Sequence, residues 1–301
     1  MSGYKNFAIV GAGLIGSVVT QQFLKDKAAG TVNQVVVLTR EGSKTSIEGD
    51  AKVIPVDYTN KESLKRALAG IDVVISTIAG VALPLQGGIA EAAKEVGVKL
   101  FVPSEFGVPT EGATEGLFGA KARVQDQLKA VGLSYALFYT GPFADFIWAS
   151  FLDLDVTKGK VSVGGDGNKQ ISLTSRSDIA RYISYVLTHL PAEQLNDRSF
   201  TIAGDNKVCA WGHIRSSVFD GNVPKQSFNE IFKAYEEKTG KKLDVTYIPV
   251  SEYDARLAVN PQDFAAVLHK LWATTGPFRK NDNHLYPDWN PSAAIDNVPV
   301  A

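Results

Sequence analysis

The stretch NFAIVGAGLIGS, residues 6–17, decides the fold of this chain. An apolar run ends at Gly11, and Gly13 and Gly16 follow with the spacing G-x-G-x-x-G. Residues 14–24 are amphipathic, so the order is strand, tight turn and helix. Gly11 permits the sharp turn, Gly13 lets the backbone approach a pyrophosphate, and Gly16 lets the helix pack close to the strand. The stretch therefore predicts a dinucleotide-binding βαβ unit.

The N-terminus of this helix provides the second half of the predicted site. Its free N–H groups and partial positive charge favour the phosphates of a dinucleotide. A lone glycine motif is a weak signal, but a position between a buried-type strand and a helix strengthens it. A purely structural turn is the alternative. The candidate phosphate-binding residues are Gly11, Gly13, Leu14, Ile15 and Gly16.

The alternation of elements continues through residue 102 and predicts the fold class. Apolar runs and helical patterns predict helices over residues 61–69 and 84–96, and strands over 34–38, 52–56, 71–76 and 99–102. Mostly apolar strands are typical of a parallel sheet that is covered on both faces. The order therefore predicts an α/β protein with a Rossmann-type, doubly wound parallel sheet.

The end of the second strand discriminates between the two nicotinamide cofactors. NAD sites usually place an Asp or Glu there, whereas NADP sites place an Arg near the ribose 2′-phosphate. Here Arg40 ends the strand and Lys44 follows, while Glu41 can point away. These residues favour NADP(H), with a solvated loop of mixed charge as the alternative. Asp57 and Thr77, which follow the third and fourth strands, are further candidate cofactor-binding residues.

The α/β alternation weakens after Gly141. The later patterns are mixed and predict helices over residues 177–188, 229–239, 251–259 and 263–273, with strands over 160–163, 170–173, 199–203 and 243–248. We therefore expect an NAD(P)-binding Rossmann domain over residues 1–150. A smaller α+β substrate-binding region is expected over residues 151–301.

Composition limits the classes of partner. The net charge of −1 favours neither nucleic acid nor an anionic membrane surface. No apolar run approaches the roughly 20 residues that span a bilayer, and no signal peptide precedes the first strand. Cys209 is the only cysteine, which favours a reducing, cytoplasmic location. The four histidines lack metal-ligand spacing, so we expect no bound metal. The expected partner is a small-molecule substrate.

Several longer motifs extend from the first glycine turn to the C-terminal part of the chain. They are GAGLIG (11–16), LTR (38–40), FVPSEFG (101–107), FGAKARVQDQLKAVGLSYALFYTGPFADF (118–146), GDGNKQISLTSRSDIAR (165–181) and LYPDW (285–289). This set resembles the NmrA-like and isoflavone-reductase-like group of atypical short-chain dehydrogenases, which includes the phenylcoumaran benzylic ether reductases. FVPSEFG, followed by a helix near Lys121, is the most specific of the motifs.

The resemblance implies that one lysine on that helix is catalytic in the reductases of the group, and Lys121 stands in its place. Typical short-chain dehydrogenases use Tyr-x-x-x-Lys, but the tyrosine position here is Leu117. A single lysine near NADP can still bond the nicotinamide ribose and polarise or protonate a substrate oxygen. The alternative is a solvated lysine, because Arg123 and Lys129 also make this helix basic.

Two functions remain open. The first is an NADPH-dependent reductase of a small aromatic or phenolic substrate, with Phe106, Phe143 and Phe146 as candidate substrate-binding residues. Ordinary core packing explains these side chains equally well. The second is a non-catalytic NADP(H)-binding redox sensor of NmrA type, which regulates a protein partner. Lys121 favours the enzyme, because a sensor has no need of it.

Residues 208–226 interrupt the resemblance as a possible insertion of 19 residues. Without them, GDNK leads directly into SFNEIFKAYEEKTG at ordinary loop length. The segment begins with Val208, whose codons all begin with GT, and ends with Gln226, one of whose codons is CAG. A translated intron is therefore one interpretation, and a genuine surface loop is the other.

Overall fold

A computed structural model describes residues 3–43, 47, 49–204 and 226–299 of the chain. The chain forms two compact units. Unit 1 comprises Met1–Tyr139 and Ile179–Phe200, and unit 2 comprises Thr140–Asp178 and Thr201–Ala301. The expected boundary at residue 150 differs from this division, because the chain leaves unit 1 at residue 139 and returns to it for residues 179–200.

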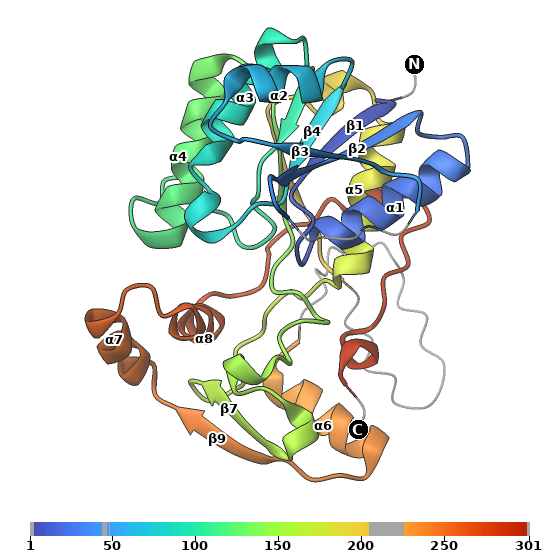
Figure 1. Ribbon diagram of the computed structural model, residues 1–301. Coiled ribbons are helices and arrows are strands. Elements are labelled where there is room, and N and C mark those ends of the chain that lie inside the picture. The colour runs from blue at the N-terminus through green and yellow to red at the C-terminus, as the bar shows by residue number, and fades with distance from the viewer. Residues whose placement is uncertain (1–2, 44–46, 48, 205–225, 300–301) are drawn as a thin grey trace. The chain divides into compact units, whose positions relative to one another are not determined.

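Unit 1 is built on a parallel sheet with the strand order β3-β2-β1-β4-β5 (Figure 1). Its strands are β1 (Asn6–Val10), β2 (Gln34–Arg40), β3 (Lys52–Val56), β4 (Val73–Ser76) and β5 (Leu100–Val102). Its helices between these strands are α1 (Gly16–Ala28), α2 (Lys61–Leu68) and α3 (Leu85–Glu95), with α4 (Gly116–Val131) after β5. The predicted Rossmann-type fold is confirmed, and the strand order reverses between β1 and β4.

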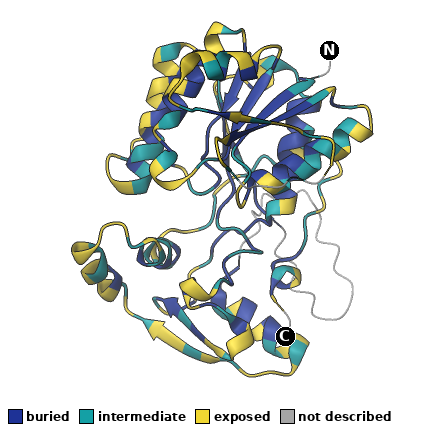
Figure 2. Cartoon of the chain, in the orientation of Figure 1, coloured by how far each residue is buried: buried dark blue, intermediate teal, exposed yellow. Residues whose placement is uncertain are grey.

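Alternate residues of each central strand face opposite helix layers. Val10 of β1 belongs to a core with Leu64 of α2, Ile89 of α3 and Val124 of α4. Phe7, on the other face of β1, packs against Phe23 of α1 with ring centroids 4.5 Å apart. Helices on both faces explain why β1, β4 and β5 are almost entirely buried, as Figure 2 shows, whereas β3 at the edge of the sheet is largely exposed.

Helix α5 (Arg176–His189) explains the return of the chain to unit 1. Its residues Ile179, Ile183 and Val186 are fully buried. Ser184 donates a hydrogen bond to the carboxylate of Asp26 on α1. Beyond α5, β8 (Arg198–Thr201) pairs with β6 (Ala136–Tyr139), and a parallel bridge from residue 135 to residue 101 joins β6 to β5.

Unit 2 has a smaller α+β arrangement. A parallel pair, β7 (Lys160–Gly164) and β9 (Asp244–Ile248), accompanies α6 (Phe228–Thr239), α7 (Val250–Val259) and α8 (Phe264–Thr274). Its core includes Trp148, Val161, Phe228 and Trp272. Ser227 and Glu230 form a reciprocal capping box that fixes the start of α6.

The chain on either side of residues 205–225 is anchored to one extended segment of unit 2. The N–H of Gly204 donates to the carbonyl oxygen of Leu173 at 2.8 Å, and Gln226 exchanges two backbone hydrogen bonds of 2.9 Å with Ile171. This isolated bridge replaces the regular strand expected over residues 170–173. Of the possible insertion 208–226, all but Gln226 lies outside the described residues, as does Lys44.

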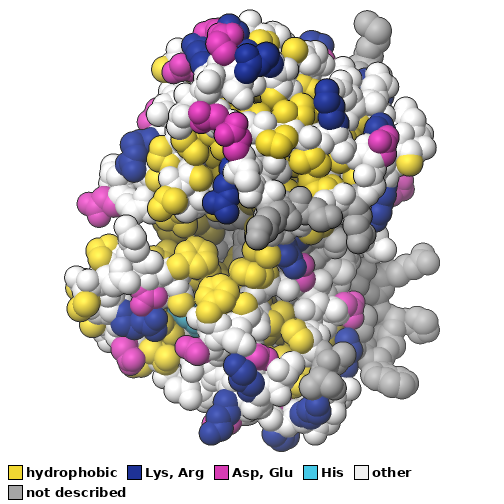
Figure 3. All heavy atoms as spheres, in the orientation of Figure 1, with side chains coloured by type: hydrophobic (Ala, Val, Ile, Leu, Met, Phe, Trp, Pro, Cys, Tyr) yellow, Lys and Arg dark blue, Asp and Glu magenta, His cyan; other side chains and the backbone are white. Residues whose placement is uncertain are grey.

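Charge is mixed on the face drawn in Figure 3, where basic and acidic side chains alternate without a patch of one sign. Within the described residues, no helix combines the length and apolar character needed to cross a bilayer. No cluster of three or more His, Cys, Asp or Glu suited to a metal ion occurs in the same part of the chain.

Candidate active site

The glycine turn at the end of β1 has geometry that other residues cannot adopt without strain. Gly11 has a φ of 91°, in the left-handed region. A Cβ on Gly11 would also lie 3.2 Å from Thr77 Oγ1 and from Ile78 Cγ2. A Cβ on Gly16 would overlap both Thr77 Oγ1 and the carbonyl oxygen of Gly11. Both glycines are therefore required for the close packing of α1 against the sheet.

Gly13 stands in a different environment, because in the described part of the chain a Cβ on it would meet no heavy atom within 4 Å beyond its two chain neighbours. The space in front of the turn is therefore open at this position. Among the described residues, no side chain caps the N-terminus of α1, so its positive end can receive an anion. Leu14 is 42% exposed beside the turn, whereas Ile15 is buried.

Thr77 holds the turn from the neighbouring strand. Its hydroxyl donates a bifurcated hydrogen bond to the carbonyl oxygens of Val10, at 3.0 Å, and Gly11, at 2.9 Å. Its N–H donates to Val10 as well, at 2.9 Å. Thr77 therefore lies at the point where the strand order reverses, which is where open α/β sheets bind ligands. Its hydroxyl shapes the glycine turn.

Arg40 and Asp57 lie at the carboxyl ends of the neighbouring strands β2 and β3. Arg40 is the last residue of β2, is exposed, and has no ion-pair partner among the described residues. Asp57 follows β3, and its carboxylate accepts hydrogen bonds from the N–H and hydroxyl of Thr59 at 2.8 and 2.7 Å. These bonds lower the pKa of Asp57. Arg40 is thus the cation that this edge presents to solvent, and Asp57 is engaged in a local turn.

Lys121 lies on α4 and directs its ammonium group toward the loop after β5. Nζ donates a hydrogen bond to the main-chain carbonyl oxygen of Glu105. Burial lowers the pKa of Lys121, and the Glu105 carboxylate opposes this shift. Lys129 on the same helix is different, since its side chain is 54% exposed. An amine with a lowered pKa at the carboxyl edge of a parallel sheet is suited to holding or delivering a proton.

The loop after β5 is fixed by polar residues that the sequence patterns did not single out. Gln125 Nε2 and Thr110 Oγ1 donate to the carboxylate of Glu105 at 2.8 and 2.9 Å. The side-chain oxygen of Gln86 accepts from the N–H of Ser104 at 2.9 Å. Gln125 could have been anticipated, because it stands four residues after Lys121 and shares its helix face. Thr110 and Gln86 carried no sequence signal.

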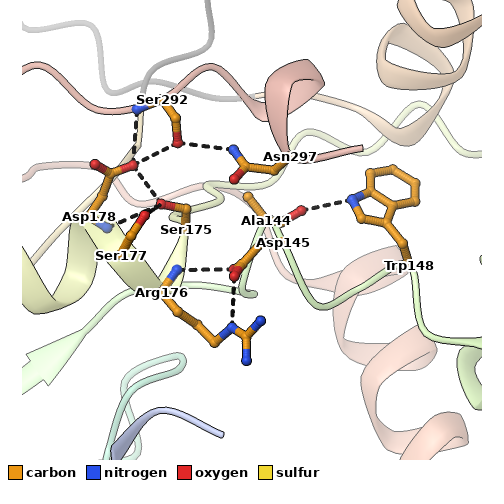
Figure 4. A network of polar contacts seen from close by, with 9 residues as sticks. All are labelled: Ala144, Asp145, Trp148, Ser175, Arg176, Ser177, Asp178, Ser292 and Asn297. Carbon is orange, nitrogen blue, oxygen red and sulfur yellow. Dashed lines mark hydrogen bonds and ion pairs between the residues drawn. The ribbon is translucent and has the colours of Figure 1, made fainter. Parts of the chain in front are cut away.

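The candidate substrate residues are divided between the two units. Phe106 lies in unit 1 and is buried, whereas Phe143 and Phe146 lie in unit 2 and are half-buried. The guanidinium carbon of Arg176 lies 5.7 Å from the centre of the Phe146 ring. Arg176 also donates to the Asp145 carboxylate from its N–H at 3.0 Å and from Nε at 2.8 Å (Figure 4). These contacts fix the backbone around Phe146.

A second part of this network joins the first turn of α5 to the C-terminal part of unit 2. The buried carboxylate of Asp178 accepts from Ser175 Oγ at 2.6 Å and from the N–H and Oγ of Ser292 at 2.9 and 2.8 Å (Figure 4). Asn297 donates in turn to Ser292 Oγ at 3.0 Å. This polar network has a structural role, since its members bind one another across 114 residues of sequence.

The sequence model of the NmrA-like family matches residues 4–297. The chain belongs to the NmrA-like family. This NmrA-like protein is 31% identical to isoflavone reductase homolog A622-like of Nicotiana tabacum over 264 residues, which are 81% of its own chain and 77% of the relative. It is 28% identical to phenylcoumaran benzylic ether reductase Pyrc5 of Pyrus communis over 307 residues, covering 96% and 90% of the two chains.

Solved structures share the fold of this NmrA-like protein. AtPrR2 with NADP+ and (+)-pinoresinol superposes with a TM-score of 0.75 at 22% identity, over 98% of both chains. The leucoanthocyanidin reductase–NADPH complex from Vitis vinifera has a TM-score of 0.75 at 18% identity, over 96% and 97% of the chains. Both neighbours are nicotinamide-nucleotide complexes by description, and at this identity the likeness establishes the fold.

Proposed function

We propose that this NmrA-like protein is an NADPH-dependent reductase of a small phenolic or other aromatic substrate, with Lys121 as its catalytic residue. The observation that carries the proposal is the half-buried ammonium of Lys121, bonded to Glu105 in the loop after β5. Relatives that are phenylcoumaran benzylic ether reductases support the substrate class, as does a neighbour described with (+)-pinoresinol.

The residues at the carboxyl edge of the sheet fit NADP(H). The open space beside Gly13 and the uncapped N-terminus of α1 suit the pyrophosphate. Arg40 suits the ribose 2′-phosphate because its planar guanidinium can form two parallel hydrogen bonds to phosphate oxygens. Lys44 is assigned to the same phosphate from its sequence position. Bound NADPH would supply the hydride for the reduction.

Lys121 serves as the proton donor in this proposal. Its ammonium form would bond the substrate oxygen and donate a proton to it while bound NADPH supplies the hydride, so the substrate gains one hydride and one proton, which are two electrons and two protons in total. The neutral amine then takes a proton from solvent. The candidate substrate-binding residues are those that the sequence indicates, Phe106, Phe143 and Phe146, because aromatic side chains suit a phenolic substrate.

The test is a screen of NADPH oxidation against phenylpropanoid, quinone and aldehyde substrates. We expect turnover of at least one aromatic substrate, and we expect Lys121→Ala to reduce it by roughly a hundredfold or more while NADPH binding persists. Lys129→Ala, which removes an exposed lysine from the same helix, is the matched control and should retain activity. Binding of NADPH without turnover of any substrate would instead favour the redox sensor, and normal turnover in Lys121→Ala would exclude the assigned role.

A further inference from the structure

Glu105 is bound to α4 through both its main chain and its side chain. Its main-chain carbonyl accepts the hydrogen bond from Lys121, and its carboxylate accepts the one from Gln125. Gln125 Nε2 also donates to Thr110 Oγ1 at 2.8 Å, so Gln125, Thr110 and the carboxylate form a closed triangle. Glu105 is only 1% exposed. A carboxylate buried to this degree needs such hydrogen bonds and a nearby cation.

We propose that Glu105 is the positioning residue of Lys121. Its anchored main chain aims the ammonium group, and its buried carboxylate supplies a counter-charge to that group. The inference rests on the proposed function for its consequence in catalysis. The positioning itself is a property of unit 1.

The backbone around Glu105 supports this role. The N–H of Glu105 donates to the carbonyl oxygen of Pro103 at 2.8 Å, which makes a tight turn directly after β5. The next residue, Phe106, has a φ of 37° although it is not glycine, and its N–H donates to Phe138 of β6 at 3.0 Å. Left-handed backbone at a bulky residue persists where surrounding contacts enforce it, and it often marks a functional site. This turn directs the main-chain carbonyl oxygen of Glu105 toward Lys121 on α4.

The charges around this pair identify the carboxylate as the group that acts on Lys121. Burial lowers the pKa of Lys121, and among the described residues Glu105 is the carboxylate that opposes this lowering. Burial is the main reason that the pKa of Glu105 is raised. Glu111, an exposed acid of the same loop, makes a smaller contribution in the same direction. Burial raises the pKa of Tyr139, whose phenol is therefore neutral at physiological pH.

The direct test is the titration of Lys121 in the full chain, without substrate or cofactor. The rate of its labelling by an amine-reactive acetylating reagent, followed by mass spectrometry across pH, reports the fraction of neutral amine. In Glu105→Gln, which keeps the shape of the side chain and removes its charge, we expect the midpoint to fall by about one pH unit or more. Glu111→Gln makes the same change on the exposed acid and should leave the midpoint nearly unmoved.

This measurement separates the inference from the proposed function, because it needs no substrate. An identical midpoint in the wild type and Glu105→Gln overturns the inference even if the reductase activity is real. A lowered midpoint supports it even if the screen finds no substrate. Should Glu105→Gln fail to fold, Lys121→Met tests the same coupling from the other side, because removal of the ammonium group should raise the pKa of the Glu105 carboxyl, as followed by carboxyl-carbon NMR, and an unmoved pKa there would overturn the inference.

Kinetics supply the second readout. With an identified substrate, the alkaline limb of the kcat profile should move to lower pH in Glu105→Gln by the same amount as the labelling midpoint, with a smaller effect on KM. A loss of turnover with an unmoved alkaline limb would show that Glu105 merely supports the fold of the loop.

Discussion

The hydroxyl oxygen of Thr77 occupies space that a Cβ on Gly16 would need. The same oxygen is hydrogen-bonded to the turn that precedes Gly16, so β1, the turn and α1 are held together by one side chain that directly follows β4. The glycine spacing therefore has two separate physical functions, close packing at Gly16 and open space at Gly13.

Gly16→Ala should destabilise the protein. The new methyl group would overlap the carbonyl oxygen of Gly11 as well as Thr77, and overpacking of this kind costs about 1–3 kcal/mol. Denaturant unfolding of the variant against the wild type measures the loss. Gly13→Ala, whose methyl group enters open space, is the matched control, and equal stability of the two variants would contradict the packing argument.

Gly13→Val should leave stability nearly unchanged and abolish NADPH binding. Apart from its two chain neighbours, no described residue has a heavy atom within 4 Å of the added Cβ, so the fold accepts it, but the side chain takes the place of the pyrophosphate. Unfolding curves and fluorescence titration with NADPH give the two readouts. Retained binding would mean that the cofactor site lies elsewhere.

Arg40→Ala should weaken NADPH roughly tenfold or more, because a bidentate Arg–phosphate contact contributes about 1.5–3 kcal/mol. NADH lacks the 2′-phosphate, so its affinity should change little. Arg66→Ala removes an exposed arginine of α2 and serves as the control for general charge effects. Equal losses for both cofactors would refute the assignment of Arg40.

His269 of α8 should make the protein less stable in mild acid. It is 3% exposed, its Nε2 lies 2.7 Å from the carbonyl oxygen of Leu152, and burial lowers its pKa. The unfolded chain then binds more protons than the native one as pH falls below the usual histidine pKa of about 6.5, so stability is lost in that window. His269→Gln can keep the donor to Leu152 and should flatten the pH dependence of unfolding.

The exposed His284 of the same unit supplies the control for this pH effect. His284→Gln should retain the wild-type loss of stability between pH 7.5 and pH 5.5. A pH dependence in His269→Gln as steep as that of the wild type would assign the acid sensitivity to other groups.

Deletion of residues 208–226 should leave stability equal or better. Gly204 and Gln226 bond to Leu173 and Ile171, which are two residues apart on one extended segment and hence roughly 7 Å apart. In the deletion variant, three residues follow Gly204 up to Lys207, whose backbone can take over the bridge to Ile171. Three extended residues reach about 10 Å, so the gap can be closed.

Thermal unfolding of the deletion variant is the measurement, and transcript sequencing examines the intron interpretation separately. A lower melting temperature, together with transcripts that all contain the segment, would establish a genuine loop.

The amino-acid sequence determined the fold class and indicated the proposed cofactor edge, because both depend on local patterns. The glycine spacing specifies the turn, the apolar runs specify covered strands, and Arg40 ends its strand as the spacing predicts. Lys121 was singled out through the motif that surrounds it.

Only the tertiary structure decided what each of these groups contacts. Thr77 and Gly11 are 66 residues apart, and Glu105 and Gln125 are 20 apart, so no periodicity within one element reports these hydrogen bonds. The return of α5 to unit 1 likewise depends on the burial of residues 179–186 against residues of unit 1 that are distant in the sequence. Sequence patterns fix which face of an element is apolar, whereas the partner of each polar side chain is fixed by packing between elements that are distant in the chain.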